Sequence, residues 1–184
     1  MEQITQNQKK RVITTKEMTM MSLMAAFLSV SSYIVIPLPF STASITAQTI
    51  VVNLVGMILE PLQAGLVLIV WILAGLIGIP VFAGGATGPA KLLGPTGGYI
   101  LGFLVAAVLI SIFCKKQKDI RKQTLFLIVV GIPVIYFLGA VWMKIITQQP
   151  WSGILIQAVL PFIPLDIVKC FAAVALAKAL RPII

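Results

Sequence analysis

An aspartate and a lysine near the end of the chain are the residues whose types and spacing point most clearly to chemistry. Asp166 and Lys169 lie three residues apart in an apolar run, and residues at that spacing share one face of a helix. A carboxylate inside a membrane-spanning helix costs about 2.5–3.5 kcal/mol on insertion, so it usually faces a cavity or a partner. Pro164 leaves backbone carbonyls unpaired beside the acid, which suits a broken helix that lines a site. The two residues are therefore predicted either to bind a polar ligand or to form a purely structural ion pair.

A Gly-rich stretch, residues 94–99, leads into a later apolar run and is the second candidate. Thr96 is placed to cap the helix that follows, and the glycines allow a ligand to approach the backbone closely. Free N–H groups at a helix start attract anions, although tight helix packing explains the same glycines. No Gly-Lys dipeptide occurs in the chain, which excludes a nucleotide-binding P-loop and ATP hydrolysis by that route.

Four further side chains are candidates for contact with a ligand. Thr46 and Gln48 stand at the start of an apolar run, where they bind a ligand or merely cap a helix. Phe82 and Tyr99 flank the Gly-rich segment, and such aromatic residues either form an interfacial belt or stack on a ligand. Both interpretations remain open for each pair.

The first apolar run carries small residues at helical spacing. Ser22 with Ala26, and Ala25 with Ser29, give two small-xxx-small pairs, and such surfaces let another helix approach closely. They predict either packing inside the bundle or a docking face for a partner subunit.

Composition excludes a soluble domain. The 184 residues are 59% hydrophobic and 10% charged, with a mean hydropathy of +1.07, whereas soluble domains are about half apolar and a quarter charged. No His occurs, and the two cysteines are far apart in sequence, so we expect no metal site, no catalytic residue and no enzyme. The net charge of +9 is better explained by anionic lipid headgroups than by nucleic acid, because no nucleic-acid-binding motif accompanies it.

Hydrophobic runs of this size predict an all-α integral membrane protein with six transmembrane helices. Each crossing needs about 20 apolar residues, and the expected spans are residues 19–38, 49–59, 62–79, 99–113, 125–146 and 152–180. Pro133 should kink the fifth span, and Pro161 and Pro164 should interrupt the sixth. Residues 80–98 hold too much Gly and Pro for a regular helix. We expect residues 1–16 to form a basic cytoplasmic lead and residues 17–184 a single transmembrane domain.

The placement of the cations predicts the orientation in the membrane. Eleven of the 14 cations gather before the first span, in one loop and at the end of the chain: Lys9, Lys10, Arg11 and Lys16, then Lys115, Lys116, Lys118, Arg121 and Lys122, then Lys178 and Arg181. The other three are Lys91, Lys144 and Lys169. Six crossings put all three clusters on one side, which the positive-inside rule assigns to the cytoplasm. Both termini should therefore be cytoplasmic, and residues 84–97 should face outward from the plasma membrane.

The motifs of the chain resemble those of the BioY family, the biotin-specific S components of energy-coupling factor (ECF) transporters. The resemblance rests on Gly78-Ile79-Pro80-Val81-Phe82-Ala83-Gly84-Gly85, Leu93-Gly94-Pro95-Thr96-Gly97-Gly98-Tyr99, Gly102-Phe103, Ser44-Ile45-Thr46-Ala47-Gln48 and Pro164-Leu165-Asp166-Ile167-Val168-Lys169. These stretches span nearly the whole chain.

The resemblance implies an S-component bundle of six helices with a biotin pocket near its outer face, no cofactor, and partnership with a transmembrane coupling subunit and two ATPases. It assigns biotin contact to Asp166 and Lys169. We expect seven further residues to bind the ligand: Thr46, Gln48, Phe82, Gly84, Gly85, Thr96 and Tyr99. An Asn that holds the ureido ring in some members is missing from Gly84-Gly85-Ala86, so backbone groups or Gln48 would replace it. The small residues of the first helix resemble the surface that docks on the coupling subunit.

Three alternatives remain. The chain can be an S component for another vitamin, a structural subunit of a membrane complex, or an intramembrane enzyme that uses Asp166 and Lys169. The last is disfavoured, since the chain has no His, no Ser nucleophile beside a base, and no second carboxylate near Asp166.

Overall fold

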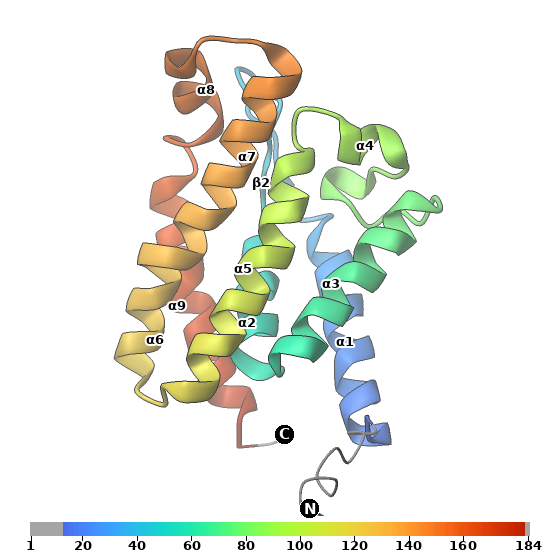
Figure 1. Cartoon of the computed structure of the whole chain (residues 1–184), viewed down its shortest axis with the longest axis vertical. Coiled ribbons are helices and arrows are strands. Elements are labelled where there is room, and N and C mark those ends of the chain that lie inside the picture. Colours follow the sequence, from blue (N-terminus) through green and yellow to red (C-terminus); the bar gives the residue numbers. More distant parts are fainter. Residues whose placement is uncertain (1–12, 183–184) are drawn as a thin grey trace, which may run out of the picture.

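The computed structural model describes residues 13–182 as a bundle of helices (Figure 1). Its elements are α1 (Thr15–Ser31), β1 (Val35–Ile36), β2 (Ile45–Thr46), α2 (Gln48–Ile58), α3 (Pro61–Leu76), η1 (Ala83–Gly85), α4 (Pro89–Leu93), α5 (Gly97–Lys116), α6 (Ile120–Phe126), the π-helical turn η2 (Leu127–Gly131), α7 (Ile132–Thr147), α8 (Trp151–Ala158) and α9 (Ile163–Leu180). The start of α1 and the end of α9 lie at one end of the bundle, and α4 and α8 lie at the other (Figure 1).

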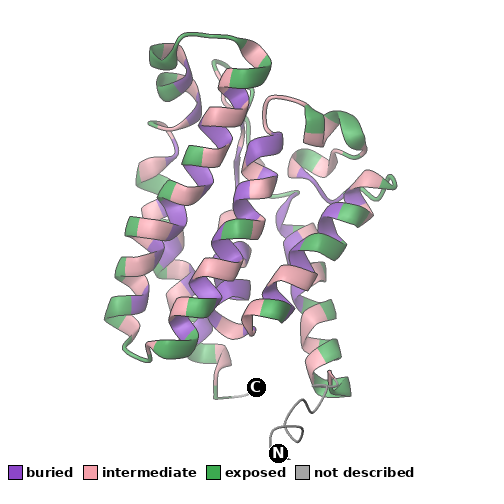
Figure 2. Ribbon diagram, in the orientation of Figure 1, coloured by how far each residue is buried: buried purple, intermediate pink, exposed green. Residues whose placement is uncertain are grey.

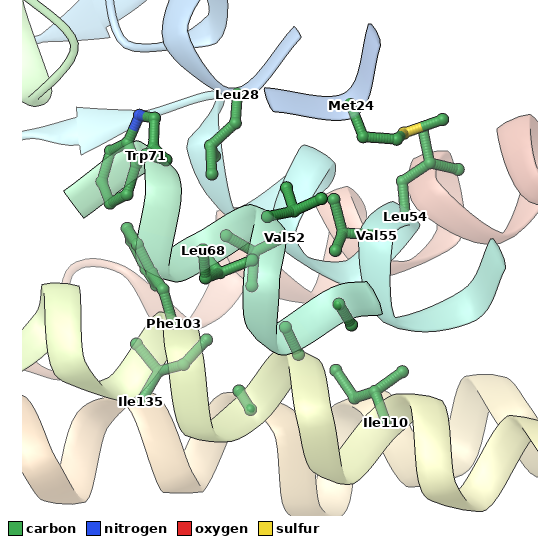
Figure 3. Packing of buried hydrophobic residues seen from close by; sticks show 14 of the residues in the cluster. Met24, Leu28, Val52, Leu54, Val55, Leu68, Trp71, Phe103, Ile110 and Ile135 are labelled. Carbon is green, nitrogen blue, oxygen red and sulfur yellow. The ribbon is translucent and has the colours of Figure 1, made fainter. Parts of the chain in front are cut away.

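Helix α5 lies at the centre of the bundle. It packs against α2, α3 and α7, while α9 packs on α2 and α1 packs on α2 and α3. Figure 3 shows Val52, Leu68, Phe103 and Ile110 among the side chains that fill the space between these helices. Trp71 adds a large ring that is 1% exposed. The core is therefore made where α5 meets its neighbours.

The outer faces of the bundle are apolar as well. Large side chains such as Leu62, Ile77 and Phe137 are 67–80% exposed, and exposed residues cover the outward surfaces of the helices (Figure 2). Apolar patches of this extent are rare on soluble monomers, and hydrocarbon as the surrounding solvent explains them.

Helix length alone does not establish six crossings. Within residues 13–182, two helical stretches are long and apolar enough to span a membrane, Gly97–Lys116 and Ile120–Thr147. The pair α8 and α9 counts as a third if their 44° bend is one broken span. Helices α2 and α3 are apolar but shorter.

The first helix begins and ends earlier than predicted. Thr14 caps it through a capping box with Glu17, so the helix already includes the last two residues of the expected lead; residues 1–12 lie outside the described part of the chain. It ends at Ser31 rather than Leu38, because the chain turns into β1, which pairs antiparallel with β2. The β-branched Val35 and Ile36 favour this extended pairing, and Pro37 follows them. The two-residue strands were not predicted.

The other segments follow the prediction more closely. Residues 80–96 hold only η1 and the five-residue α4, and α5 begins at Gly97, two residues before the predicted start of the fourth span. Near Pro133, where a kink was expected, the structure has the π-helical turn η2, which ends two residues before that proline, and Ile120–Thr147 runs as one helical stretch. Proline cannot donate a backbone hydrogen bond, which fits a local change of helical pairing there. The expected basic loop is shorter, because α5 reaches Lys116 and α6 begins at Ile120, capped by Asp119. The last segment is broken between α8 and α9, near Pro161 and Pro164.

Candidate binding site

A cavity lies toward the α4 and α8 end of the bundle, where the starts of α2, α5 and α9 approach α7 (Figure 1). Its polar lining comprises Ser44, Thr46, Gln48, Thr49, Lys91, Thr96, Tyr99, Tyr136, Asp166 and Lys169. Its apolar lining comprises Ala43, Ala83, Phe103, Ile135 and Phe162. The cavity thus combines aromatic and aliphatic walls with a few polar anchors, the usual composition of a small-molecule site.

Asp166 and Lys169 form an ion pair in the wall of this cavity. The Lys169 Nζ lies 2.7 Å from Asp166 Oδ1, and the two side chains are 13% and 6% exposed. The pair follows from the helix itself, because α9 begins at Ile163 and places both residues on its first turns. A buried pair of this kind neutralises its own charge while its open edges remain available to a polar ligand.

Two more side chains hold the Asp166 carboxylate from other helices. Thr49 on α2 donates its hydroxyl to Oδ1 at 3.2 Å, and Tyr136 on α7 donates its phenol to Oδ2 at 2.7 Å. Three donors therefore converge on one carboxylate, which fixes its orientation before any ligand arrives.

Six of the nine predicted ligand-binding residues line the cavity: Thr46, Gln48, Thr96, Tyr99, Asp166 and Lys169. Gln48 is 2% exposed, and its amide faces the Val81 carbonyl at 3.5 Å. Thr96 occupies the N-cap position of α5, but its side chain makes no capping hydrogen bond. The predicted capping role of Thr96 is therefore wrong, and its side chain is left to the cavity.

The structure places the other three predicted residues outside the cavity lining. Phe82 is completely buried and meets Trp71 edge to face at 5.2 Å. It fits because Gly75 faces it, where a Cβ atom would lie 2.2 Å from the ring. Gly84 and Gly85 form a turn with φ of 73° at each residue, and only the neighbouring Ala83 reaches the cavity. Gly84 and Gly85 lie instead against the residues that follow α1, because the Gly84 N–H donates to the Ser32 carbonyl at 2.9 Å and a Cβ atom on Gly85 would lie 3.0 Å from the Tyr33 ring.

Thr49, Tyr136 and Lys91 also line the cavity but were not predicted from the sequence. The first two are linked to Asp166 only through the fold. Lys91 sits on the short α4, outside the long helices, and burial lowers the pKa of its amine from the ordinary value of 10.5. One signal was available, because Lys91 is the only charged residue in the irregular segment 80–98. Among the described residues, Lys91 supplies a second cation to a cavity whose lining holds one carboxylate, that of Asp166.

The predicted docking residues of α1 divide between two environments. Ser22 and Ala26 are exposed, whereas Ala25 and Ser29 are half-buried. Ser22 and Ala25 line a shallow groove between α1 and α3, and Ser29 donates its hydroxyl to the Ala25 carbonyl at 2.9 Å. Part of the small-residue surface therefore packs inside the bundle, and part is open to a partner.

No cluster of metal-ligating side chains occurs in the part of the chain that the structure describes. Cys114 and Cys170 are both buried free thiols.

Comparison with known proteins identifies a family. The model of the BioY family matches residues 5–184. The chain is similar to biotin transporter BioY2 of Lactococcus lactis, with 35% identity over 89% of this chain and 88% of that protein. It is also similar to a probable biotin transporter BioY of Pyrococcus horikoshii, with 34% identity over 90% of this chain and 96% of the relative.

A solved structure shares the fold. The crystal structure of the S component for biotin from an ECF-type ABC transporter superimposes with a TM-score of 0.85, covers 91% of each chain, and is 29% identical.

Proposed function

This chain belongs to the BioY family, and we propose that it captures biotin in the cavity around Asp166 and Lys169, as the S component of an ECF transporter. The family is a transporter component and not an enzyme, and biotin is its transported ligand rather than a cofactor. The buried ion pair in an aromatic cavity is the observation that carries the assignment of the site.

The chemistry of biotin matches the lining of the cavity. Its ureido ring has two N–H donors and one carbonyl acceptor, which complement the Asp166 carboxylate and the Lys169 ammonium. Its apolar sulfur ring fits against Phe103, Ile135 and Phe162. Gln48 adds an amide in place of the Asn that the Gly84-to-Ala86 loop lacks. Each polar group of the ring thus has a partner among buried side chains, as a desolvated site requires.

Membrane topology and partners extend this proposal. We place six crossings in the plasma membrane with both termini in the cytoplasm, because the start of α1 and the end of α9 share one end of the bundle with the basic residues 115–122 (Figure 1). The biotin cavity then opens toward the outer face. The exposed Ser22 and Ala26 of α1 dock on the coupling subunit, and two ATPases supply the energy for reorientation and release.

The decisive experiment is isothermal titration of biotin into the purified protein, with thiamine and riboflavin as competing ligands. The proposal expects tight, saturable binding of biotin and none of the other two vitamins. If another vitamin binds and biotin does not, the chain is an S component of different specificity. No binding of any vitamin would favour a structural subunit.

Lys91 is expected to bind the carboxylate tail of biotin. Replacement by Ala should weaken biotin binding about tenfold, since a charge-assisted contact is worth about 1.5 kcal/mol or more. The same variant should bind biotinamide, whose tail is neutral, with nearly the affinity of the parent. Calorimetry of both ligands with the parent and the variant measures the interaction energy between Lys91 and the carboxylate of biotin. An equal loss of affinity for biotin and biotinamide would contradict the assignment.

The lowered pKa of Lys91 gives this contact a pH dependence. Only the protonated amine attracts the carboxylate, so the affinity for biotin should fall as pH rises through that lowered pKa, below 10.5. The ratio of the affinities for biotin and biotinamide isolates this effect. A change in protonation of side chains near the ureido ring would affect both ligands alike.

A further inference from the structure

A second cavity, of about 300 Å³, lies at the end of the bundle opposite the biotin cavity. It is formed where α2, α5 and α9 end and α3 begins, near both ends of the described chain (Figure 1). Three cations line it, Lys115, Lys118 and Arg181, together with Glu60, Ser111, Cys114 and residues 56–59. These residues have no part in the proposed capture of biotin.

Within residues 13–182, the lining of the cavity carries a positive charge. Glu60 is the only acidic residue that this part of the chain contributes, and one of its carboxylate oxygens pairs with Lys115 Nζ at 3.1 Å. Lys118 and Arg181 remain as two cations that no acidic group of the lining neutralises. Lys118 forms no ion pair within residues 13–182.

Arg181 is held in place for binding. Its Nη2 donates to the Met57 carbonyl at 3.0 Å and to Gln123 Oε1 at 2.9 Å. Gln123 is completely buried and is itself fixed, because its amide donates to the Gln117 carbonyl. Both bonds use one terminal nitrogen, and the other N–H groups of the guanidinium make no hydrogen bond among the described residues. An arginine with fixed orientation and open donors loses little conformational entropy when it binds an oxyanion.

We propose that this cavity binds a phosphate group, as carried by the headgroup of an anionic phospholipid. A phosphate offers several oxygens in different directions, which suits an arginine and a lysine on separate elements better than one planar carboxylate does. The cavity also lies at the ends of apolar helices, where headgroups are found, and basic pockets between such helices bind anionic lipids. Free inorganic phosphate shares this chemistry and is the other source of the ligand.

The experiment titrates short-chain phosphatidylglycerol, short-chain phosphatidylcholine and sodium phosphate separately into the full chain in neutral detergent, by calorimetry at constant ionic strength. Lys118→Ala is the test variant, because Lys118 is exposed and makes no bond that the fold requires. Lys116→Ala is the matched control, since Lys116 is an exposed lysine at the same helix end that does not line the cavity. Biotin binding serves as the check that each variant is folded.

Phosphatidylglycerol is expected to bind and phosphatidylcholine to bind much more weakly. Lys118→Ala should weaken phosphatidylglycerol binding about fivefold, the effect of about 1 kcal/mol for one basic residue near a headgroup, while Lys116→Ala stays within about twofold. Binding of inorganic phosphate alone, with the same difference between variants, would support the site with free phosphate as its ligand. Two results would overturn the proposal: an equal loss of affinity in Lys118→Ala and Lys116→Ala, or no binding of either phosphatidylglycerol or inorganic phosphate to the parent.

Discussion

Replacing Asp166 by Asn is expected to weaken biotin binding about 100-fold or more, a loss of about 2.7 kcal/mol. The carboxylate accepts from Lys169, Thr49 and Tyr136 at once. An amide has one acceptor oxygen and one donor NH₂, so its nitrogen must face a donor on one side, and Lys169 is left as a buried cation without a counter-charge. Removing one partner of a buried pair costs about 3–5 kcal/mol because the other charge stays desolvated. The ureido N–H groups of biotin would lose their charged acceptor as well.

The matched control for this variant is Asp119→Asn. Asp119 is an exposed N-cap of α6 and makes no contact with the cavity, so the same chemical change should leave the dissociation constant within about twofold of the parent. Lys169→Ala should weaken binding more than about tenfold, since it removes the donor to the ring carbonyl. Calorimetry measures the affinities, and size-exclusion chromatography in detergent shows whether each variant is folded. Parent-like affinity of Asp166→Asn would exclude this cavity as the biotin site.

The ion pair could be predicted from the sequence because its geometry is local. Two residues three positions apart in a helix meet wherever that helix packs, and the cost of a lone carboxylate in hydrocarbon demands a partner. The partners from other helices could not be found this way. Thr49 and Tyr136 lie 117 and 30 residues from Asp166 in the chain, and only the packing of α2, α7 and α9 brings them together.

The positions of the aromatic residues show a second limit. Phe82 and Tyr99 flank the same Gly-rich segment, and nothing in their local sequence separates them. In the structure Phe82 is buried against Trp71, and of these two aromatic residues only Tyr99 lines the cavity. The difference depends on Gly75, which leaves room for the Phe82 ring. The space that accepts the Phe82 ring is made by Gly75 on α3. The sequence around Phe82 therefore does not indicate that this space exists.

Prolines predicted the start of α3 but misplaced two helix ends, because α1 ends at Ser31 and α3 at Leu76, before Pro37 and Pro80. Pro61 begins α3, and Pro133 follows a π-helical turn, as the chemistry of proline requires. The end of α1 at Ser31 has no such breaker, and the serines there only bond back to the carbonyls of Leu28 and Ser29. Its end depends on the pairing of β1 with β2, which lies outside any local pattern.

Close packing of α5 on α7 is a feature that the sequence could have indicated. Gly98 and Gly102 are four residues apart, a Gly-xxx-Gly spacing that favours close helix approach. In the structure a Cβ atom on Gly98 would lie 2.3 Å from Trp142 Cβ and 2.4 Å from the Leu138 carbonyl oxygen. The close approach also seats Tyr99, whose hydroxyl donates to the Ala158 carbonyl and whose ring faces Gly139. The position of Tyr99 in the wall of the proposed biotin cavity therefore depends on this contact between α5 and α7.

Gly98→Ala is accordingly expected to destabilise the protein by about 3 kcal/mol or more, because neither the Leu138 backbone nor the start of the Trp142 side chain can move aside. For a chain of this length that corresponds to a fall of about 6 to 12 °C in the midpoint of thermal unfolding, measured by tryptophan fluorescence in detergent. Gly65→Ala on α3 is the control, since its nearest neighbour would be Val108 Cγ2 at an ordinary 3.5 Å. Alanine also favours a helix over glycine, so the control should match or exceed the parent in stability. Equal unfolding midpoints for the two variants would mean that α5 and α7 pack less closely than the structure shows. The position of Tyr99 in the wall of the cavity would then have no explanation in helix packing.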